Sequence, residues 1–181
     1  MRSLLVVPAK GVLLIITVVA ALIAVAGWLW MWPAEQDIEA RGYGIVPLQL
    51  AFTPQRAEAI LEAWGPDGQS SARAGMLRDF LFMAGYGLAF ASVTLWVARA
   101  QSGLLQQAGL TLTLMPLAAV LLDALENILL LSVLGIMPPP PVPILAASLS
   151  ASIKFLLLAL TILYWVAGGV ARIAKKASRE G

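Results

Sequence analysis

Four long apolar stretches constrain the fold of this chain more than any other feature. They cover residues 11–32, 76–98, 108–135 and 144–170. A helix needs about 20 apolar residues to cross the hydrocarbon core of a bilayer, because each residue adds about 1.5 Å of length. Since 60% of the chain is hydrophobic and only 12% is charged, too few polar side chains remain to cover a water-soluble surface. The sequence therefore predicts an all-α protein, a four-transmembrane-helix bundle that forms a single membrane domain over residues 1–181.

A polar segment, residues 33–75, separates the first two apolar stretches. We expect residues 33–44 to be irregular and residues 45–52, IVPLQLAF, to form a short extended segment. Pro47 cannot donate a hydrogen bond within a sheet, which argues against a central strand there. The first half of the segment is therefore predicted to contain no helix.

The second half of this segment has the pattern of a short amphipathic helix. Thr53 and Pro54 are residue types preferred at the N-cap and at the first helical position, and Gly65-Pro66 is typical of a helix end. We expect this helix to lie on an apolar surface and to cap the periplasmic mouth of the bundle, as a lid without a ligand role. Its apolar side chains recur at helical spacing, apart from the charged ones: Ala57, Ile60, Leu61 and Trp64.

Basic and acidic side chains are distributed unequally among the connections. The segment 33–75 contains six acidic and three basic residues, whereas the connection after the third stretch is uncharged. Because Lys and Arg are enriched in cytoplasmic connections, we expect a multi-pass protein of the bacterial inner (cytoplasmic) membrane with both termini in the cytoplasm. The lipid bilayer is then the expected partner, and nucleic acid is not. The basic residues that flank the other ends of the stretches are Arg2, Lys10, Arg99, Arg172, Lys175, Lys176 and Arg179.

The N-terminus has an alternative interpretation. Arg2 and Lys10, followed by an apolar run and by Ala24-Val25-Ala26, have the pattern of a cleavable signal peptide. The apolar run continues to Trp32, however, which suits a membrane anchor better. We therefore favour a first transmembrane helix.

Ionisable side chains inside three of the apolar stretches are the strongest functional signal. Such groups are costly in hydrocarbon, so they normally face one another or a polar cavity. Counting about 1.5 Å per residue from the expected periplasmic helix ends places most of them in one layer, roughly 13–18 Å deep. Their spacing also places them on common helix faces. The candidate site, a ligand-binding or buried polar network, consists of Asp79, Tyr86, Asp123, Glu126, Asn127 and Lys154.

Lys154 is expected to lie between Asp123 and Glu126, because a lysine without a partner at that depth would lose its proton. One lysine cannot neutralise both of these carboxylates and Asp79. At least one of Asp123 and Glu126 is therefore predicted to be protonated at neutral pH, or to share its charge with water or a bound cation. Asp79 has no evident partner on its own helix face besides Tyr86, whereas the Lys154–Glu126 pair has the clearest structural role.

The sequence contains no cysteine and no histidine. Disulfides, thiol redox chemistry, imidazole-bound haem and the usual zinc sites are therefore excluded. A metal ion could be held only by carboxylates, and we expect no metal site and no cofactor.

Small residues and prolines predict how the helices pack and bend. Gly85, Gly87 and Ala91 allow close approach of a neighbouring helix, either within the bundle or in another copy of the chain. Pro116 is expected to kink the third transmembrane helix. The prolines of residues 138–143 predict a short, stiff hairpin connection.

A family resemblance rests on four segments of the chain: RDFLFMAGYG, LLDALENILLL, IKFLLLAL and IVPLQLAFTPQRAEAILEAWG. The second of these contains a D-x-x-E-N motif. In these segments the chain resembles an uncharacterised family of small bacterial four-span integral membrane proteins with that motif in the third span. The resemblance implies a membrane location and a four-span topology, and no particular reaction.

Three functions are compatible with this polar layer. The favoured one is a non-enzymatic protein that binds a lipid-like or other amphiphilic small molecule, or that joins a membrane complex or homo-oligomer. The second is a membrane-embedded lipid- or isoprenoid-modifying enzyme with Asp123 and Glu126 as candidate catalytic acid and base, and with Tyr86 and Asn127 positioning the substrate. The third is a small proton-coupled transporter that uses Asp79 or Glu126. In a purely structural role, the layer would only fix helix register.

Overall fold

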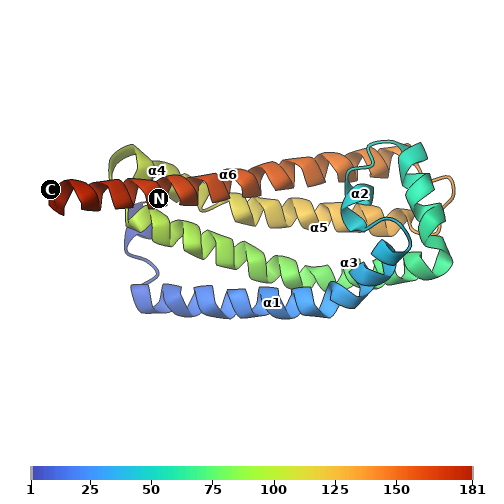
Figure 1. The fold of residues 1–181 in the computed structure, drawn as a ribbon, viewed down its shortest axis with the longest axis horizontal. Helices are drawn as coiled ribbons and strands as arrows, with labels where there is room; N and C mark the ends of the chain where they lie inside the picture. Colours follow the sequence, from blue (N-terminus) through green and yellow to red (C-terminus); the bar gives the residue numbers. More distant parts are fainter. Residues whose placement is uncertain (1, 181) are drawn as a thin grey trace.

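The structure, a computed structural model, describes residues 2–180, and each regular element in that range is a helix. Long helices run side by side along the molecule, and both termini lie at the same end (Figure 1). The side chains of Arg2, Lys176 and Arg179, which belong to the predicted basic flanks, lie outside the described part. The elements are η1 (Arg2–Leu5), α1 (Lys10–Ala40), α2 (Ile45–Gln49), α3 (Pro54–Arg99), α4 (Gly103–Leu112), α5 (Met115–Val133) and α6 (Pro141–Glu180).

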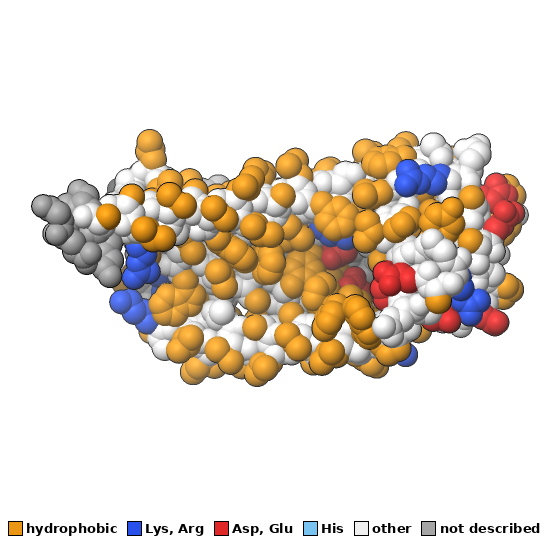
Figure 2. Space-filling model, in the orientation of Figure 1, with side chains coloured by type: hydrophobic (Ala, Val, Ile, Leu, Met, Phe, Trp, Pro, Cys, Tyr) orange, Lys and Arg blue, Asp and Glu red, His pale blue; other side chains and the backbone are white. Residues whose placement is uncertain are grey.

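Four helical segments in the described range are long and apolar enough to cross a membrane. Their outward side chains are largely hydrophobic, as the orange surface in Figure 2 shows. The predicted all-α class and the predicted number of transmembrane helices are therefore confirmed, and the chain is a multi-pass membrane protein. The segments are Lys10–Ala40, Pro54–Arg99, Gly103–Val133 and Pro141–Lys175.

The connection after the first span is much shorter than predicted. Helix α1 continues through Pro33 to Ala40, so the proline does not end the helix. The prediction of an extended segment at residues 45–52 is wrong, since Ile45–Gln49 forms α2. Pro47 lies in the first turn of α2, where a backbone N–H would have no intrahelical partner. Glu35 links α1 to α2, because its Oε1 accepts a hydrogen bond from the Ile45 N–H at 3.0 Å.

The first part of helix α3 begins and ends as predicted, and a second helical part follows it directly. Thr53 is its N-cap, and its Oγ1 accepts a hydrogen bond from the Arg56 N–H at 3.4 Å. At Gly65 the backbone has φ 62° and ψ −175°, which is not helical and which glycine adopts without steric cost. The chain changes direction there and resumes as a helix at Pro66. The segment before this bend lies across one end of the bundle (Figure 1).

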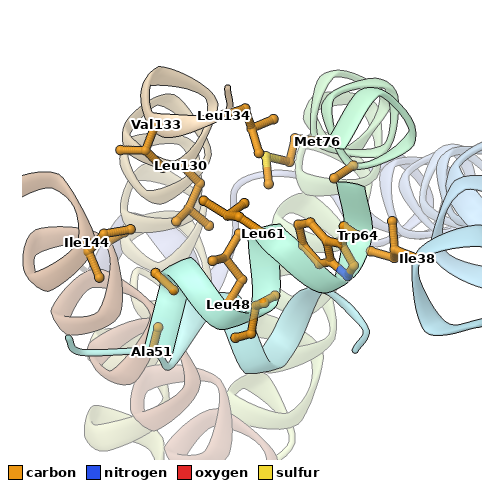
Figure 3. Close-up of a cluster of buried hydrophobic side chains, with 14 residues drawn as sticks. Ile38, Leu48, Ala51, Leu61, Trp64, Met76, Leu130, Val133, Leu134 and Ile144 are labelled. Atoms are coloured by element: carbon orange, nitrogen blue, oxygen red, sulfur yellow. The ribbon is translucent and has the colours of Figure 1, made fainter. Parts of the chain in front are cut away.

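A hydrophobic cluster holds this crosswise segment in place, and we call it the end cluster (Figure 3). Leu61 and Trp64 of α3 are fully buried: Leu61 lies near Leu48 of α2 and Leu130 of α5, and Trp64 lies near Ile38 of α1. Burial of one large apolar side chain contributes about 1.5–3 kcal/mol, so the cluster is a strong anchor. The four side chains predicted to form the apolar stripe are at most 1% exposed: Ala57, Ile60, Leu61 and Trp64. The predicted apolar face is confirmed, while its periplasmic side stays a prediction.

The third span is broken rather than kinked. Helix α4 ends at Leu112, and α5 begins at Met115 with Pro116 in its first turn. Because the first N–H groups of a helix have no intrahelical partner, the proline costs nothing there. The expectation of a kink within one continuous helix is corrected accordingly.

Small residues act within the chain. A Cβ atom at Gly85 would collide with the backbone of Ala24 in α1, and one at Gly87 would collide with the side chain of Val120 in α5. These glycines therefore let α3 approach α1 on one side and α5 on the other. Helix α6 packs mainly against α5.

Candidate functional site

A cleft of about 490 Å³ opens on the side of the bundle between α1 and α6, and we call it the lateral cleft. Side chains of α3 and α5 line its floor, and side chains of α2 line the end nearest the end cluster. Figure 2 shows Asp, Glu, Lys or Arg side chains recessed in a hollow of the otherwise hydrophobic surface. A hollow on this side of a membrane bundle faces the acyl chains of the lipid.

An ion-pair network lies in the layer predicted from the sequence. Lys154 Nζ lies 2.7 Å from Asp123 Oδ1 and 2.7 Å from Glu126 Oε2. All three residues are at most 5% exposed. The prediction that Lys154 lies between the two carboxylates of α5 is therefore confirmed. Nζ also lies 4.8 Å from the centre of the Phe155 ring, a favourable cation–π distance.

Asp123 has a partner on each oxygen. Oδ1 accepts a hydrogen bond from Lys154 Nζ at 2.7 Å, and Oδ2 accepts one from the Tyr86 hydroxyl at 2.7 Å. Charge-assisted hydrogen bonds of this length are among the stronger ones in proteins. Asp123 therefore joins α3, α5 and α6 at one point, and all three side chains line the lateral cleft.

Glu126 is the most deeply buried member of the network and does not line the lateral cleft. Its contact with Lys154 is an ion pair without hydrogen-bond geometry. Neither of its oxygens has a hydrogen-bond partner within the described range. The ammonium group of Lys154 is therefore the one charged group that offsets the burial of this carboxylate within the described range. The protonation state itself stays a prediction.

Asp79 has a different partner from the one expected. Its Oδ2 accepts a hydrogen bond from Asn127 Nδ2 at 2.7 Å, whereas Tyr86 binds Asp123. Asp79 and Tyr86 are about 10 Å apart along α3, so each meets a different turn of α5. Asp79 is half-buried, lines the cleft and forms no salt bridge with any described residue.

Sequence reasoning missed several residues of the lateral cleft, including the carboxylate of Glu35. It was assigned to an irregular connection because Pro33 was expected to end the first helix. The spacing of Met31, Ala34, Glu35 and Ile38 was the available signal, since it continues one helix face beyond the proline. The other missed residues of the cleft include Val25, Phe82, Phe90 and Phe155.

The cleft is rich in hydrogen-bond acceptors. Glu35, Asp79 and Asp123 line it, and Lys154 is the lining cation. Lys154 is already engaged with two carboxylates, so it has little to offer an incoming anion. The floor therefore suits a polar group that donates hydrogen bonds. Within residues 2–180 no group of three or more acidic side chains is placed to hold a metal ion.

The fold and this site define a class: a multi-pass, four-helix membrane protein with a buried Asp/Glu–Lys salt bridge. No protein-family model matches the chain, and searches of curated proteins and of solved structures find no match either. The resemblance to bacterial four-span proteins with a D-x-x-E-N motif therefore stays a prediction.

Proposed function

We propose that this protein binds an amphiphilic molecule of the bilayer in the lateral cleft. The observation that carries the proposal is a polar floor at the bottom of a cleft that opens toward lipid. The apolar part of the ligand would lie along the hydrophobic walls, and its polar head would reach Asp79 and Tyr86. Sites of a few hundred Å³ with mostly apolar walls and a few convergent polar groups are typical of small-molecule binding.

A purely structural role accounts for only part of the polar layer. Lys154 and Glu126 are at most 4% exposed, as expected for a pair that fixes helix orientation. Asp79 differs, because it is half-buried at the cleft wall and bound only through Asn127 among the interactions described above. A carboxylate is costly next to lipid unless a ligand or water meets it, and this asymmetry supports ligand binding over scaffolding.

The chemistry of the cleft favours a head group with an amine or hydroxyl. Such groups donate hydrogen bonds to carboxylates, whereas a phosphate would be repelled by the three acidic side chains of the cleft. Aromatic rings of Phe82, Phe90 and Phe155 line the same cleft and can stabilise an ammonium group over their faces. An alkyl ammonium or a long-chain alcohol is therefore the proposed ligand class.

The proposed location is the bacterial inner membrane with both termini in the cytoplasm. In support, the charged side chains visible at the end with the termini are Lys and Arg, whereas the opposite end shows Asp and Glu together with Lys or Arg (Figure 2). This asymmetry is the one that the positive-inside rule describes. Membership of a larger membrane complex is compatible with the same cleft, with a partner helix taking the place of the ligand.

The geometry gives less support to the two other functions. An enzyme with Asp123 and Glu126 as acid and base would need both at the substrate, but Glu126 lies outside the cleft and Asp123 has both oxygens engaged. A transporter would need a path to the other side of the membrane. Phe90, which lines the cleft, instead packs against Trp165 with ring centres 4.7 Å apart. This aromatic pair obstructs such a path.

Ligand preference tests the proposal directly. The purified protein would be mixed with dodecylamine, dodecanol or dodecyl phosphate, and thermal unfolding would be followed by tryptophan fluorescence. We expect the amine or the alcohol to raise the unfolding temperature and the phosphate to have no such effect, because the acidic side chains of the cleft repel the phosphate. Equal shifts with all three amphiphiles would contradict the proposal.

Two variants of α1 test whether the ligand occupies the lateral cleft. Val25→Trp would narrow the cleft, since Val25 lines it and is 53% exposed. Leu22→Trp is the matched control, because Leu22 is 64% exposed on the same helix and does not line the cleft. We expect binding to be lost only in Val25→Trp. Mass spectrometry of molecules retained after gentle extraction would then identify the natural ligand.

A further inference from the structure

A second cleft, of about 450 Å³, lies near the end of the bundle that holds both termini. The start of α1, the end of α3 and the last third of α6 line it, and we call it the basic cleft. Three cationic side chains and two indole rings surround it: Lys10, Arg99, Arg172, Trp96 and Trp165. Because Phe90 of the lateral cleft packs against Trp165, the two clefts are neighbours that an aromatic pair separates.

The cations of the basic cleft have no acidic counterpart among the side chains that the structure describes in this part of the molecule. None of its lining residues is acidic. The sequence contains no Asp or Glu at residues 1–34, 80–122 or 127–179, which include all three segments that form the cleft. None of the three cations takes part in a salt bridge within the described range. The basic cleft therefore carries an uncompensated positive charge.

Arg99 shows this lack of compensation at atomic detail. Its Nε donates to the Leu4 carbonyl at 2.8 Å, and its Nη1 donates to the Pro8 carbonyl at 2.8 Å. Its Nη2 is buried and has no hydrogen-bond partner among the described atoms. Two neutral carbonyls do not balance a guanidinium charge, and a buried donor without an acceptor is costly. An anion in the cleft would balance the guanidinium charge.

The shape of the basic cleft depends on two glycines of α6. Gly168 allows α6 to approach Val97 of α3, and its carbonyl accepts a hydrogen bond from Gln101 Nε2 at 2.9 Å. A Cβ atom at Gly169 would meet nothing within 4 Å, so this position borders open space. Trp165 is fixed beside it, because its Nε1 donates to Thr94 Oγ1 at 2.9 Å. The cleft is therefore a preformed hollow with an apolar wall and cationic groups at its mouth.

Helix α1 adds to the positive potential. Lys10 is its first residue, and no side chain caps its first turn. The unpaired N–H groups at a helix start carry a partial positive charge and bind phosphate well. Lys10 and Arg172, both exposed, extend this potential toward the membrane surface.

We propose that the basic cleft binds the phosphate of an anionic amphiphile, with the phosphate between Lys10, Arg99 and Arg172 and the acyl chain against Trp96 and Trp165. A bilayer supplies this chemistry as an anionic phospholipid, and the cytosol supplies it as a free phosphate ester. The inference is independent of the proposed function, because the lateral cleft has the opposite charge.

Lipid retention tests the proposal. The protein in nanodiscs of mixed phosphatidylglycerol and phosphatidylcholine would be transferred to detergent, and retained lipids would be counted by native mass spectrometry. We expect phosphatidylglycerol to be retained in preference. The Lys10→Gln/Arg172→Gln variant should weaken this retention by about fivefold for each cation removed. Arg99 is left unchanged, because its side chain also holds Leu4 and Pro8.

A control with the same loss of charge excludes general electrostatics. The Arg56→Gln/Arg73→Gln variant removes two exposed cations far from the basic cleft and should retain phosphatidylglycerol like the parent protein. Gly169→Leu keeps every charge and fills the open space, so it should also lose the lipid. Equal retention of the two lipids, or an equal loss in both double variants, would overturn the proposal.

Competition distinguishes the two sources of phosphate. Glycerol 3-phosphate would be added at millimolar concentration to the lipid-loaded protein. If it displaces phosphatidylglycerol from the parent and does not bind Lys10→Gln/Arg172→Gln, the site accepts free phosphate esters as well. If it fails to displace the lipid, the acyl chain is required and the ligand is the phospholipid. Both results support a phosphate site, whereas binding of glycerol 3-phosphate that is equal in parent and variant would contradict it.

Discussion

The polar layer has two sides that differ in construction. On the buried side, Lys154 contacts Asp123 and Glu126, and the exposed fraction of each residue is at most 5%. On the cleft side, Asp79 is half-buried and is bound by the neutral amide of Asn127. The buried side joins α5 to α6, whereas the cleft side joins α3 to α5 and meets the opening toward lipid.

This difference indicates that the two sides have separate roles, one in stability and one in binding. A buried ion pair that loses one partner leaves a charge with no water to receive it, so the buried side is expected to govern stability. The cleft side keeps contact with the opening and can exchange partners, so it is expected to govern binding. Substitutions that separate stability from binding can therefore break or sharpen the comparison.

Lys154→Met should have the largest effect on stability. It removes the cation shared by Asp123 and Glu126, and breaking a buried pair in this way costs about 3–5 kcal/mol. Tryptophan fluorescence during thermal unfolding in detergent would measure the loss. Lys175→Met is the control, since Lys175 is exposed on the same helix. A loss of less than about 1 kcal/mol would show that the buried side does not hold the bundle together.

Glu126→Gln should have a smaller effect of about 2 kcal/mol, because Lys154 keeps its hydrogen bond to Asp123. The double variant with Lys154→Met measures the coupling between the two side chains. We expect the double variant to be more stable than Lys154→Met alone, since it contains one buried carboxylate fewer. Strict additivity of the two losses would contradict a direct interaction.

The location of the polar layer could be predicted from the sequence, because each charge lies within an apolar stretch whose length fixes its depth. The contacts of Lys154 with Asp123 and Glu126 could be predicted as well, because one helix turn separates the two acids and one lysine reaches both. The partner of Asp79 could not be predicted, since it depends on the register of α3 against α5. That register involves the close contact of Gly87 with Val120 of α5, which a pattern of small residues suggests without fixing.

The lateral cleft could not be predicted either. Its walls depend on α1 continuing beyond Pro33, and local rules for proline argue for a helix end there. Packing overrides that rule here, because Ala34 and Ile38, which follow the proline, are buried. Glu35 was therefore placed in a connection, although it lines the cleft and binds the first N–H of α2.

Tyr86 lies between the two sides, and Tyr86→Phe should cause an intermediate loss of stability. It removes the hydrogen bond to Asp123 Oδ2 and nothing else of comparable strength, so we expect a loss of about 1.5 kcal/mol. Unfolding of the variant would be measured as above, with Tyr43→Phe as the control because the Tyr43 ring is exposed. An effect as large as that of Lys154→Met would place Tyr86 with the buried side.

Asp79→Asn should have the smallest effect on stability and a large effect on binding. An asparagine at this position can still accept a hydrogen bond from Asn127, so the loss of stability should stay below about 1 kcal/mol. Binding of dodecylamine should weaken by about tenfold or more, because a hydrogen bond to a charged group contributes about 1.5–3 kcal/mol. Titration followed by tryptophan fluorescence would measure the affinity, with Glu62→Gln as an exposed control. If Asp79→Asn instead strongly lowers the stability and leaves the affinity for the amine unchanged, both sides of the layer have a structural role only.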